Sequence, residues 1–230
     1  MWRPQVEALR GSWRIVTFDA RGFGESPRGD GLLTMERIAD DAIALLDHLA
    51  EDQAVFAGLS MGGYAAFALQ RRHRARVRAL VLADTRAEAD TDEGRAGRAA
   101  LSERVRREGA EPAVDAMLPR LLSSHTRSSN PELVGSVRGM MLAAPAAGIT
   151  DALAGLGARA DSTPTLREIR CPALVVVGDE DDMTPMASAE AIHQGIAGSR
   201  LAVIPKAGHL SNMENPDAFN AALTEFLKSL

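Results

Sequence analysis

Short apolar runs that lack polar alternation recur along this chain, with helical stretches between them. A strand that is apolar at every position is buried on both faces of a sheet, and parallel strands need long crossover connections, usually helices. The pattern therefore predicts an α/β fold with a doubly wound, mostly parallel sheet. A further β-branched and aromatic run predicts one more strand, over residues 14–19. The other predicted strands cover residues 54–58, 79–83, 173–177 and 201–204.

Stretches with helical periodicity connect these runs. After Thr34, a residue type that caps helices well, apolar residues recur at every third or fourth position up to Leu49, which predicts an amphipathic helix. One long segment, residues 86–163, has several helical stretches but no convincing strand. We therefore expect a core made of residues 1–85 and 164–230, with the long segment inserted between two strands as a helical cap or lid. Further helices are predicted over residues 4–10, 62–73, 187–196 and 216–230.

The composition is that of a globular chain with a core, because 46% of its 230 residues are hydrophobic and 25% are charged. With 26 basic against 31 acidic residues the formal net charge is −5, which argues against nucleic acid as a partner. The single cysteine, Cys171, cannot form an internal disulfide, and no Cys/His group has zinc-ligand spacing. No apolar stretch suits a signal peptide or a membrane span. We expect a cytoplasmic protein that binds neither membrane nor nucleic acid, and the sequence does not indicate its oligomeric state.

The segment Gly58-Leu59-Ser60-Met61-Gly62, between a predicted strand and a predicted helix, carries the clearest chemical signal. A serine on such a strained turn projects its hydroxyl from the carboxyl edge of the sheet, where it can act as a nucleophile. Glycines two residues to either side are expected, because a Cβ there would collide with neighbouring backbone. The helix N-terminus and the Met61 N–H then offer a site for an oxyanion. The simpler interpretation is a glycine turn in which Ser60 only caps the helix.

A nucleophilic serine needs a base, and the base needs a carboxylate that fixes its tautomer. His209 follows the last predicted strand, directly after Gly208, and is the candidate base. Four adjacent acids follow the preceding strand; they cannot all be buried, and spacing alone does not choose among them. These candidate carboxylates are Asp179, Glu180, Asp181 and Asp182. The remaining histidines fall on predicted helices or in the predicted cap: His48, His73, His125 and His193.

Three sequence motifs, which occur in the same order along the chain as in the α/β-hydrolase superfamily, resemble the motifs of that superfamily. Besides the serine turn, residues 19–26 resemble its D-x-R-G-x-G-x-S loop, and residues 208–216 resemble its G-H-x-x-x-x-E-x-P segment. Within the superfamily the chain looks most like 3-oxoadipate enol-lactonases and related small carboxylesterases. The resemblance implies that Asp181 is the acid of the triad, with Asp179 and Asp182 as the alternatives.

The reaction that this resemblance implies is acyl transfer to water. Ser60 attacks the carbonyl carbon of a small-molecule ester or lactone, His209 carries the proton, and Asp181 orients the imidazole. No metal or organic cofactor is needed for these steps. Hydrolases of C–C bonds and cofactor-free perhydrolases use the same triad on this fold, so both stay open as alternatives.

The sequence departs from the family pattern near its start. Family members present, before the strand equivalent to 14–19, another strand that ends in His-Gly and whose loop supplies a second oxyanion N–H; this chain has no His-Gly. That strand lies between the equivalents of 14–19 and 54–58, so without it backbone groups stay unpaired or the two neighbours close together. Two hypotheses follow: a serine hydrolase of which this chain is an N-terminally truncated form, or a catalytically impaired pseudo-enzyme or binding module. The intact serine turn, acid loop and histidine favour the first.

Overall fold

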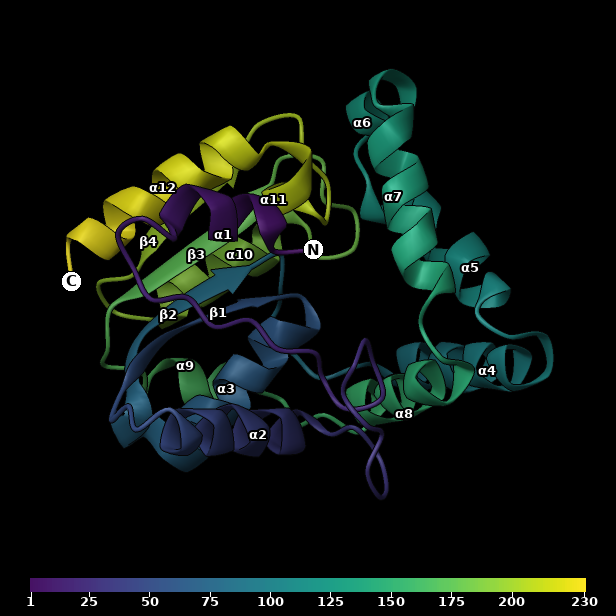
Figure 1. Cartoon of the computed structure of the whole chain (residues 1–230), viewed down its shortest axis with the longest axis horizontal. Coiled ribbons are helices and arrows are strands. Elements are labelled where there is room, and N and C mark those ends of the chain that lie inside the picture. The colour runs from purple at the N-terminus through teal and green to yellow at the C-terminus, as the bar shows by residue number, and fades with distance from the viewer.

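Four parallel strands form one sheet at the centre of the computed structural model, which describes residues 1–230 (Figure 1). Their spatial order follows the chain, and their register aligns the carboxyl ends: Leu59 pairs with Ala83, Ala83 with Val176, and Gly178 with Ile204. Whatever follows each strand therefore lies at the same edge of the sheet. The predicted α/β class and parallel sheet are confirmed. The strands are β1 (Ala54–Leu59), β2 (Val77–Ala83), β3 (Ala173–Gly178) and β4 (Arg200–Ile204).

Apolar side chains cover both faces of the sheet, as the uninterrupted apolar runs predict. In β2, Leu80 and Leu82 face a core shared with α2 (Met35–His48), α3 (Met61–His73) and α10 (Met186–Gly195). The alternate residue Val81 faces a second core, shared with the two terminal helices on the other face. Figure 1 shows α2 and α3 on one side of the sheet and α1 and α12 on the other. These terminal helices are α1 (Arg3–Leu9) and α12 (Pro216–Lys228).

The first long helix forms where the periodicity predicts it. The Thr34 side chain accepts a hydrogen bond from the Arg37 backbone N–H at 3.2 Å, which satisfies one of the donors left free at the start of α2. Its apolar stripe, which includes Met35, Ile38 and Leu46, is buried against the sheet and α3.

Most of the chain between β2 and β3 is helical and lies to one side of the sheet (Figure 1). No single helix in the structure is long and apolar enough to cross a membrane; α7 and α8 reach that length only together, and they are bent by 91°. The helices of this segment are α4 (Asp92–Glu108), α5 (Glu111–Leu121), α6 (Ser124–Ser129), α7 (Pro131–Leu142) and α8 (Ala146–Gly157). The remaining short helices are the 3-10 turn η1 (Arg74–Arg76), α9 (Thr163–Leu166), which also lies between β2 and β3, and α11 (Ser211–Glu214).

The predicted strand over residues 14–19 is wrong, because these residues form no strand. Residues 14–18 make no backbone hydrogen bond, and β1 pairs only with β2, so it is the edge of the sheet. Val16 and Phe18 are 50% and 44% exposed, although both are residue types that a sheet neighbour would bury. A strand exists only with a partner, and here β1 and the extended run are not in contact through their backbones.

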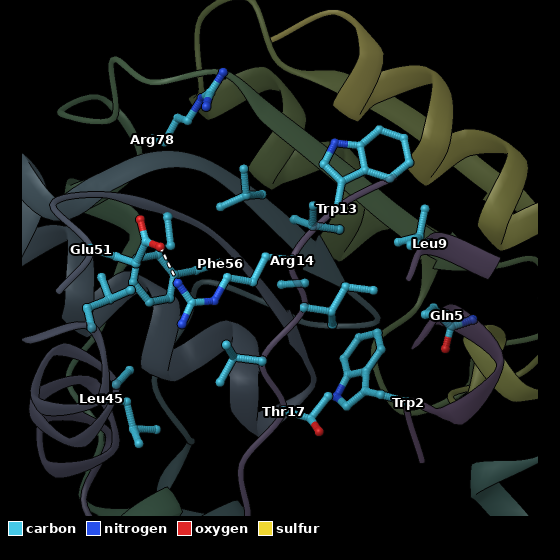
Figure 2. A pocket seen from close by; sticks show the side chains of 18 of the residues that line it. Trp2, Gln5, Leu9, Trp13, Arg14, Thr17, Leu45, Glu51, Phe56 and Arg78 are labelled. Atoms are coloured by element: carbon cyan, nitrogen blue, oxygen red, sulfur yellow. Dashed lines mark hydrogen bonds and ion pairs between the residues drawn. The ribbon is translucent and has the colours of Figure 1, made fainter. Parts of the chain in front are cut away.

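An apolar cavity of about 420 Å³ lies between this run and the open edge of β1. Figure 2 shows Trp2 and Trp13 on one side of it, while Arg14 reaches across to Glu51 at 2.6 Å. Of the two outcomes expected when a sheet neighbour is missing, the structure has unpaired backbone groups rather than a closed gap. The remaining walls of the cavity belong to β1, α2 and α12. They include Val55, Phe56, Leu45, Leu46, Leu223 and Leu227.

A buried carboxylate ties the helical segment to the core. Asp90, just before α4, pairs with Arg98 and, at 2.8 Å, with Arg159, and its side chain is 1% exposed. The Arg159 guanidinium also lies 4.3 Å from the centre of the Tyr64 ring on α3. Burial by itself would raise the pKa of Asp90, but the hydrogen bonds and charges of the two arginines outweigh it and lower the pKa to about 2.

Replacing Asp90 with asparagine is expected to lower the free energy of unfolding by about 3 kcal/mol at neutral pH, because it leaves the buried guanidinium of Arg159 and the partly buried one of Arg98 without their counter-charge. Since the folded-state pKa of Asp90 is depressed, its contribution is complete above the ordinary range of an aspartate and is lost as the pH falls toward about 2. Urea unfolding of both proteins over this range checks it: the gap between them should shrink with falling pH. Asp92→Asn is the control, because that carboxylate is 98% exposed in its pair with Arg95.

Candidate active site

The three candidate catalytic residues each follow a different strand, at the carboxyl edge of the sheet. Ser60 follows β1, Asp181 lies three residues after the end of β3, and His209 lies on the loop after β4. Because all four strands are parallel and in register, this edge collects residues that are far apart in the sequence.

Ser60 has a left-handed backbone conformation, with φ of 51° and ψ of −109°, which is strained for a residue with a side chain. Two hydrogen bonds hold it there: its N–H donates to the Ala83 carbonyl at 2.9 Å, and the Thr85 hydroxyl donates to the Ser60 carbonyl at 2.9 Å. Its own hydroxyl makes no capping hydrogen bond to α3. The simpler interpretation, in which Ser60 only caps the helix, therefore does not fit this turn.

Two glycines are required at the turn. The motif predicts one of them, Gly58, but not the other, Gly63. A Cβ on Gly58 would lie 2.2 Å from the Gly62 carbonyl oxygen, as the motif predicts. A Cβ on Gly62 would meet nothing within 4 Å, so the expectation of a collision there is wrong. The second close approach is at Gly63, whose Cβ would lie 2.4 Å from the Thr85 hydroxyl oxygen. The crowding arises where α3 passes the end of β2, which the spacing of the motif does not reveal.

This difference predicts opposite effects for two similar substitutions. Gly58→Ala should lower the free energy of unfolding by about 3 kcal/mol, because the backbone of α3 has to move. Gly62→Ala should leave it unchanged or raise it by up to about 1 kcal/mol, because alanine favours a helix and has room. Thermal or urea unfolding of the two variants checks this pair. Equal destabilisation by both would contradict the description of the turn.

Met61 is the first residue of α3, so its backbone N–H has no partner within the helix. It directly follows Ser60, at the positive end of the helix dipole. An oxyanion that forms on a carbonyl group attached to the Ser60 hydroxyl oxygen would lie next to this N–H donor.

Among the acidic residues after β3, the structure brings Asp181 to the histidine. Asp181 is 4% exposed, and its Oδ2 lies 2.9 Å from His209 Nδ1. Asp179 and Asp182 are exposed, and Asp179 binds the Ala207 backbone N–H at 3.2 Å instead. Glu180 faces away to the helical segment, where it accepts from the Ser124 backbone N–H at 2.8 Å.

Thr184 belongs to this site and sequence reasoning missed it. Its hydroxyl donates to Asp181 Oδ2 at 2.6 Å and lies 3.3 Å from His209 Nδ1. The N–H groups of Met183 and Thr184 donate to Asp181 Oδ1 at 2.8 and 2.9 Å. Burial alone would raise the pKa of Asp181, but the hydrogen bond and charge of His209 and the Thr184 contacts outweigh it, so its pKa lies below the ordinary value. An ionised Asp181 assigns the proton to Nδ1 and leaves Nε2 free to accept one.

Glu214 holds the loop that carries His209. The sequence analysis placed Glu214 in the G-H-x-x-x-x-E-x-P segment but gave it no role. Its two carboxylate oxygens accept from the backbone N–H groups of Gly208 and Ser123, both at 2.8 Å. His209 itself is 2% exposed. No hydrogen bond joins Ser60 Oγ to His209 in this structure, and such contacts are often long before a substrate binds.

The other histidines do not join the site. His73 pairs with Asp40 at 2.7 Å, and His193 lies 2.8 Å from the Ser199 hydroxyl oxygen. His48 and His125 are exposed on helices. No group of three or more His, Cys, Asp or Glu side chains lies close enough together to hold a metal ion.

Comparison with known proteins places the whole chain among relatives with this architecture. The family model for the alpha/beta hydrolase fold matches residues 1–216. The chain is 33% identical over its full length to 3-oxoadipate enol-lactonase 1 of Acinetobacter baylyi, of which it covers 84%. It resembles the solved structure of a thermophilic esterase from Thermogutta terrifontis, with a TM-score of 0.97 and 42% identity over 99% of this chain and 84% of that one. The enol-lactonase from Burkholderia xenovorans is 33% identical, with a TM-score of 0.91 over 99% of this chain and 85% of that one.

Proposed function

This chain belongs to the α/β-hydrolase fold family, and on that premise we propose that it is a serine hydrolase that cleaves carboxylic esters or lactones of small molecules. The observation that carries the proposal is the buried hydrogen bond between Asp181 and His209, at the sheet edge where Ser60 occupies its strained turn. Its relatives of 33% and 42% identity include an enol-lactonase and an esterase, which favours these two substrate classes.

The proposed reaction begins when Ser60 Oγ attacks the carbonyl carbon while His209 Nε2 takes the hydroxyl proton. Asp181 stabilises the imidazolium that results, and the Met61 N–H donates to the oxyanion. The tetrahedral intermediate collapses to an acyl-enzyme, and His209 returns its proton to the departing alkoxide. Water then attacks the acyl-enzyme with His209 as the base, which releases the acid and restores Ser60. When the substrate is a lactone, the acid and the alcohol stay in one molecule, so the product is a single hydroxy acid.

We also propose that residues 86–163 act as a cap over the strand ends. Two contacts support this: Glu180, on the acid loop, accepts from the Ser124 hydroxyl at 2.5 Å, and the Leu210 N–H, next to His209, donates to the Leu121 carbonyl at 3.2 Å. Both sides of the triad are thus in contact with the same segment.

The free, half-buried Cys171 fits the reducing cytoplasm, which we propose as the location of the enzyme.

Reaction with a fluorophosphonate probe tests the function directly, because the probe phosphonylates only a serine that a base activates. We expect the intact protein to gain the mass of one phosphonyl group, peptide mapping to place that group on Ser60, and Ser60→Ala to stay unlabelled. A site with one oxyanion donor would react about 100- to 1,000-fold more slowly than one with two, so the reaction is followed over hours. An unlabelled wild-type protein that still binds a small-molecule ester would favour the binding-module hypothesis and overturn the proposal.

A further inference from the structure

Asp84 is a buried acid that none of the steps above uses. It directly follows β2, the strand between the one that precedes Ser60 and the one that leads to Asp181 (Figure 1). Its side chain is fully buried, and its backbone is left-handed, with φ of 46°. Its N–H donates to the Val176 carbonyl at 2.8 Å, which continues the hydrogen bonding of the sheet beyond the end of β2.

The Asp84 carboxyl group contacts two segments that carry the triad. Oδ1 accepts from the Gly178 backbone N–H at 2.9 Å, and the Gly178 carbonyl in turn accepts from the Asp181 N–H at 3.2 Å. Oδ2 lies 2.5 Å from the hydroxyl of Ser211, a fully buried residue two positions after His209. The next residue in the chain, Thr85, binds the Ser60 carbonyl. One point at the end of β2 is therefore in contact with the acid loop, the histidine segment and the serine turn.

We propose that Asp84 is a positioning residue of the triad, whose buried carboxyl group ties the acid loop at Gly178 to the histidine segment at Ser211 and so sets the distance between Asp181 and His209. This inference rests on the proposed function and deepens it, because it names what holds the same site together. Asp84 itself touches no substrate atom; it acts through the two loops.

The surroundings of Asp84 favour its neutral form. Burial strongly favours the uncharged form, and the negative charge of Asp181 favours it further, so the pKa of Asp84 lies well above its ordinary value even though Ser211 and Gly178 donate to it. Asp181 on the acid loop and His209 beyond β4 are the titratable groups of the adjoining elements, and no arginine or lysine pairs with it.

Asp84→Asn and Asp84→Ala form a matched pair that tests this role. Asparagine tolerates the left-handed backbone, and its amide oxygen can accept from Gly178. Its NH₂ can keep the contact with Ser211 if the hydroxyl, which donates to Asp84 in the wild type, turns to accept. Alanine loses both contacts. We expect Asp84→Ala to lower kcat on an activated ester by about 10- to 100-fold with KM within about twofold, because the triad is misplaced rather than the substrate site. Asp84→Asn should restore most of the loss and leave the acid limb of the kcat/KM profile against pH where it is in the wild type.

Each outcome decides for or against the inference. Asp84→Ala that keeps the wild-type kcat overturns it, and so does Asp84→Asn that is as impaired as Asp84→Ala. An acid limb displaced to lower pH in Asp84→Asn overturns it as well, since Asp84 would then act on the base through its charge and not through the contacts of the two loops. If the alanine variant does not fold by circular dichroism, Ser211→Ala takes its place, with an expected fall in kcat of about 3- to 10-fold and the same acid limb. Fluorophosphonate labelling of the wild type keeps the two proposals apart. Without labelling the proposed function fails, whereas normal labelling together with a wild-type rate in both variants defeats the role of Asp84 alone.

Discussion

Replacing Ser60 with alanine is expected to lower kcat for ester hydrolysis by about a million-fold, because the acyl-enzyme can no longer form. The residual rate would come from His209 acting on water and from the Met61 N–H. Alanine carries the same Cβ as serine, so the strain of the left-handed turn, with φ of 51°, is unchanged and the thermal midpoint should stay within a few degrees. The measurement is hydrolysis of p-nitrophenyl acetate by wild type and variant, with protein concentrations matched by absorbance.

Ser12→Ala is the control for this experiment, because Ser12 is exposed in the turn after α1 and its side chain makes no hydrogen bond. It should keep the wild-type rate. A Ser60→Ala protein with a tenth or more of wild-type activity would mean that another group performs the chemistry, and the mechanism based on Ser60 would have to be abandoned.

Replacing Asp181 with asparagine should lower kcat by about ten-thousand-fold, while KM changes little. The asparagine amide is isosteric but uncharged, so it neither fixes the proton on His209 Nδ1 nor stabilises the imidazolium that forms in the transition state. The buried contacts of Oδ1 with the Met183 and Thr184 N–H groups can persist in the variant, which favours a folded protein. Steady-state kinetics with the same ester measures the effect.

The neighbouring acids provide matched controls for Asp181. Asp179→Asn and Asp182→Asn remove the same charge one or two positions away, on residues that are exposed and do not reach His209. Both variants should keep kcat within about threefold of the wild-type value, because exposed charges that contact neither the Asp181 carboxylate nor the His209 ring contribute little. If either control lost as much activity as Asp181→Asn, the triad acid would have been assigned to the wrong carboxylate.

The sequence predicted the elements whose pattern reflects their own surroundings. β2 and β3 are apolar throughout because both faces are covered, and α2 shows its stripe because one side faces the core. The run at 14–19 has the composition of a strand, yet composition cannot supply the neighbour that a strand must pair with. Its failure as a prediction is therefore a property of the sheet edge and not of those residues.

The site was predictable to the level of its motifs and no further. Spacing left four acids open after β3, and the family resemblance implied Asp181; in the structure Asp181 is the one that is buried against His209. The Asp181-x-x-Thr184 spacing is a signal that could have been used, because an aspartate often accepts from backbone N–H groups two and three residues on. Asp84 offered no such signal, since its partners lie 94 and 127 residues away in the sequence. Only the register of parallel strands brings them together.

The open edge of β1 bears on how this protein behaves at high concentration. A strand with free N–H and carbonyl groups is a template on which a second chain can add a strand of its own, and Val16 and Phe18 beside it supply exposed apolar surface for that contact. The ion pair of Arg14 with Glu51 lies at this edge, and salt weakens it. We therefore expect concentrated preparations at high salt to favour association through this edge, a result of the geometry of the sheet that leaves the chemistry of each molecule unaltered.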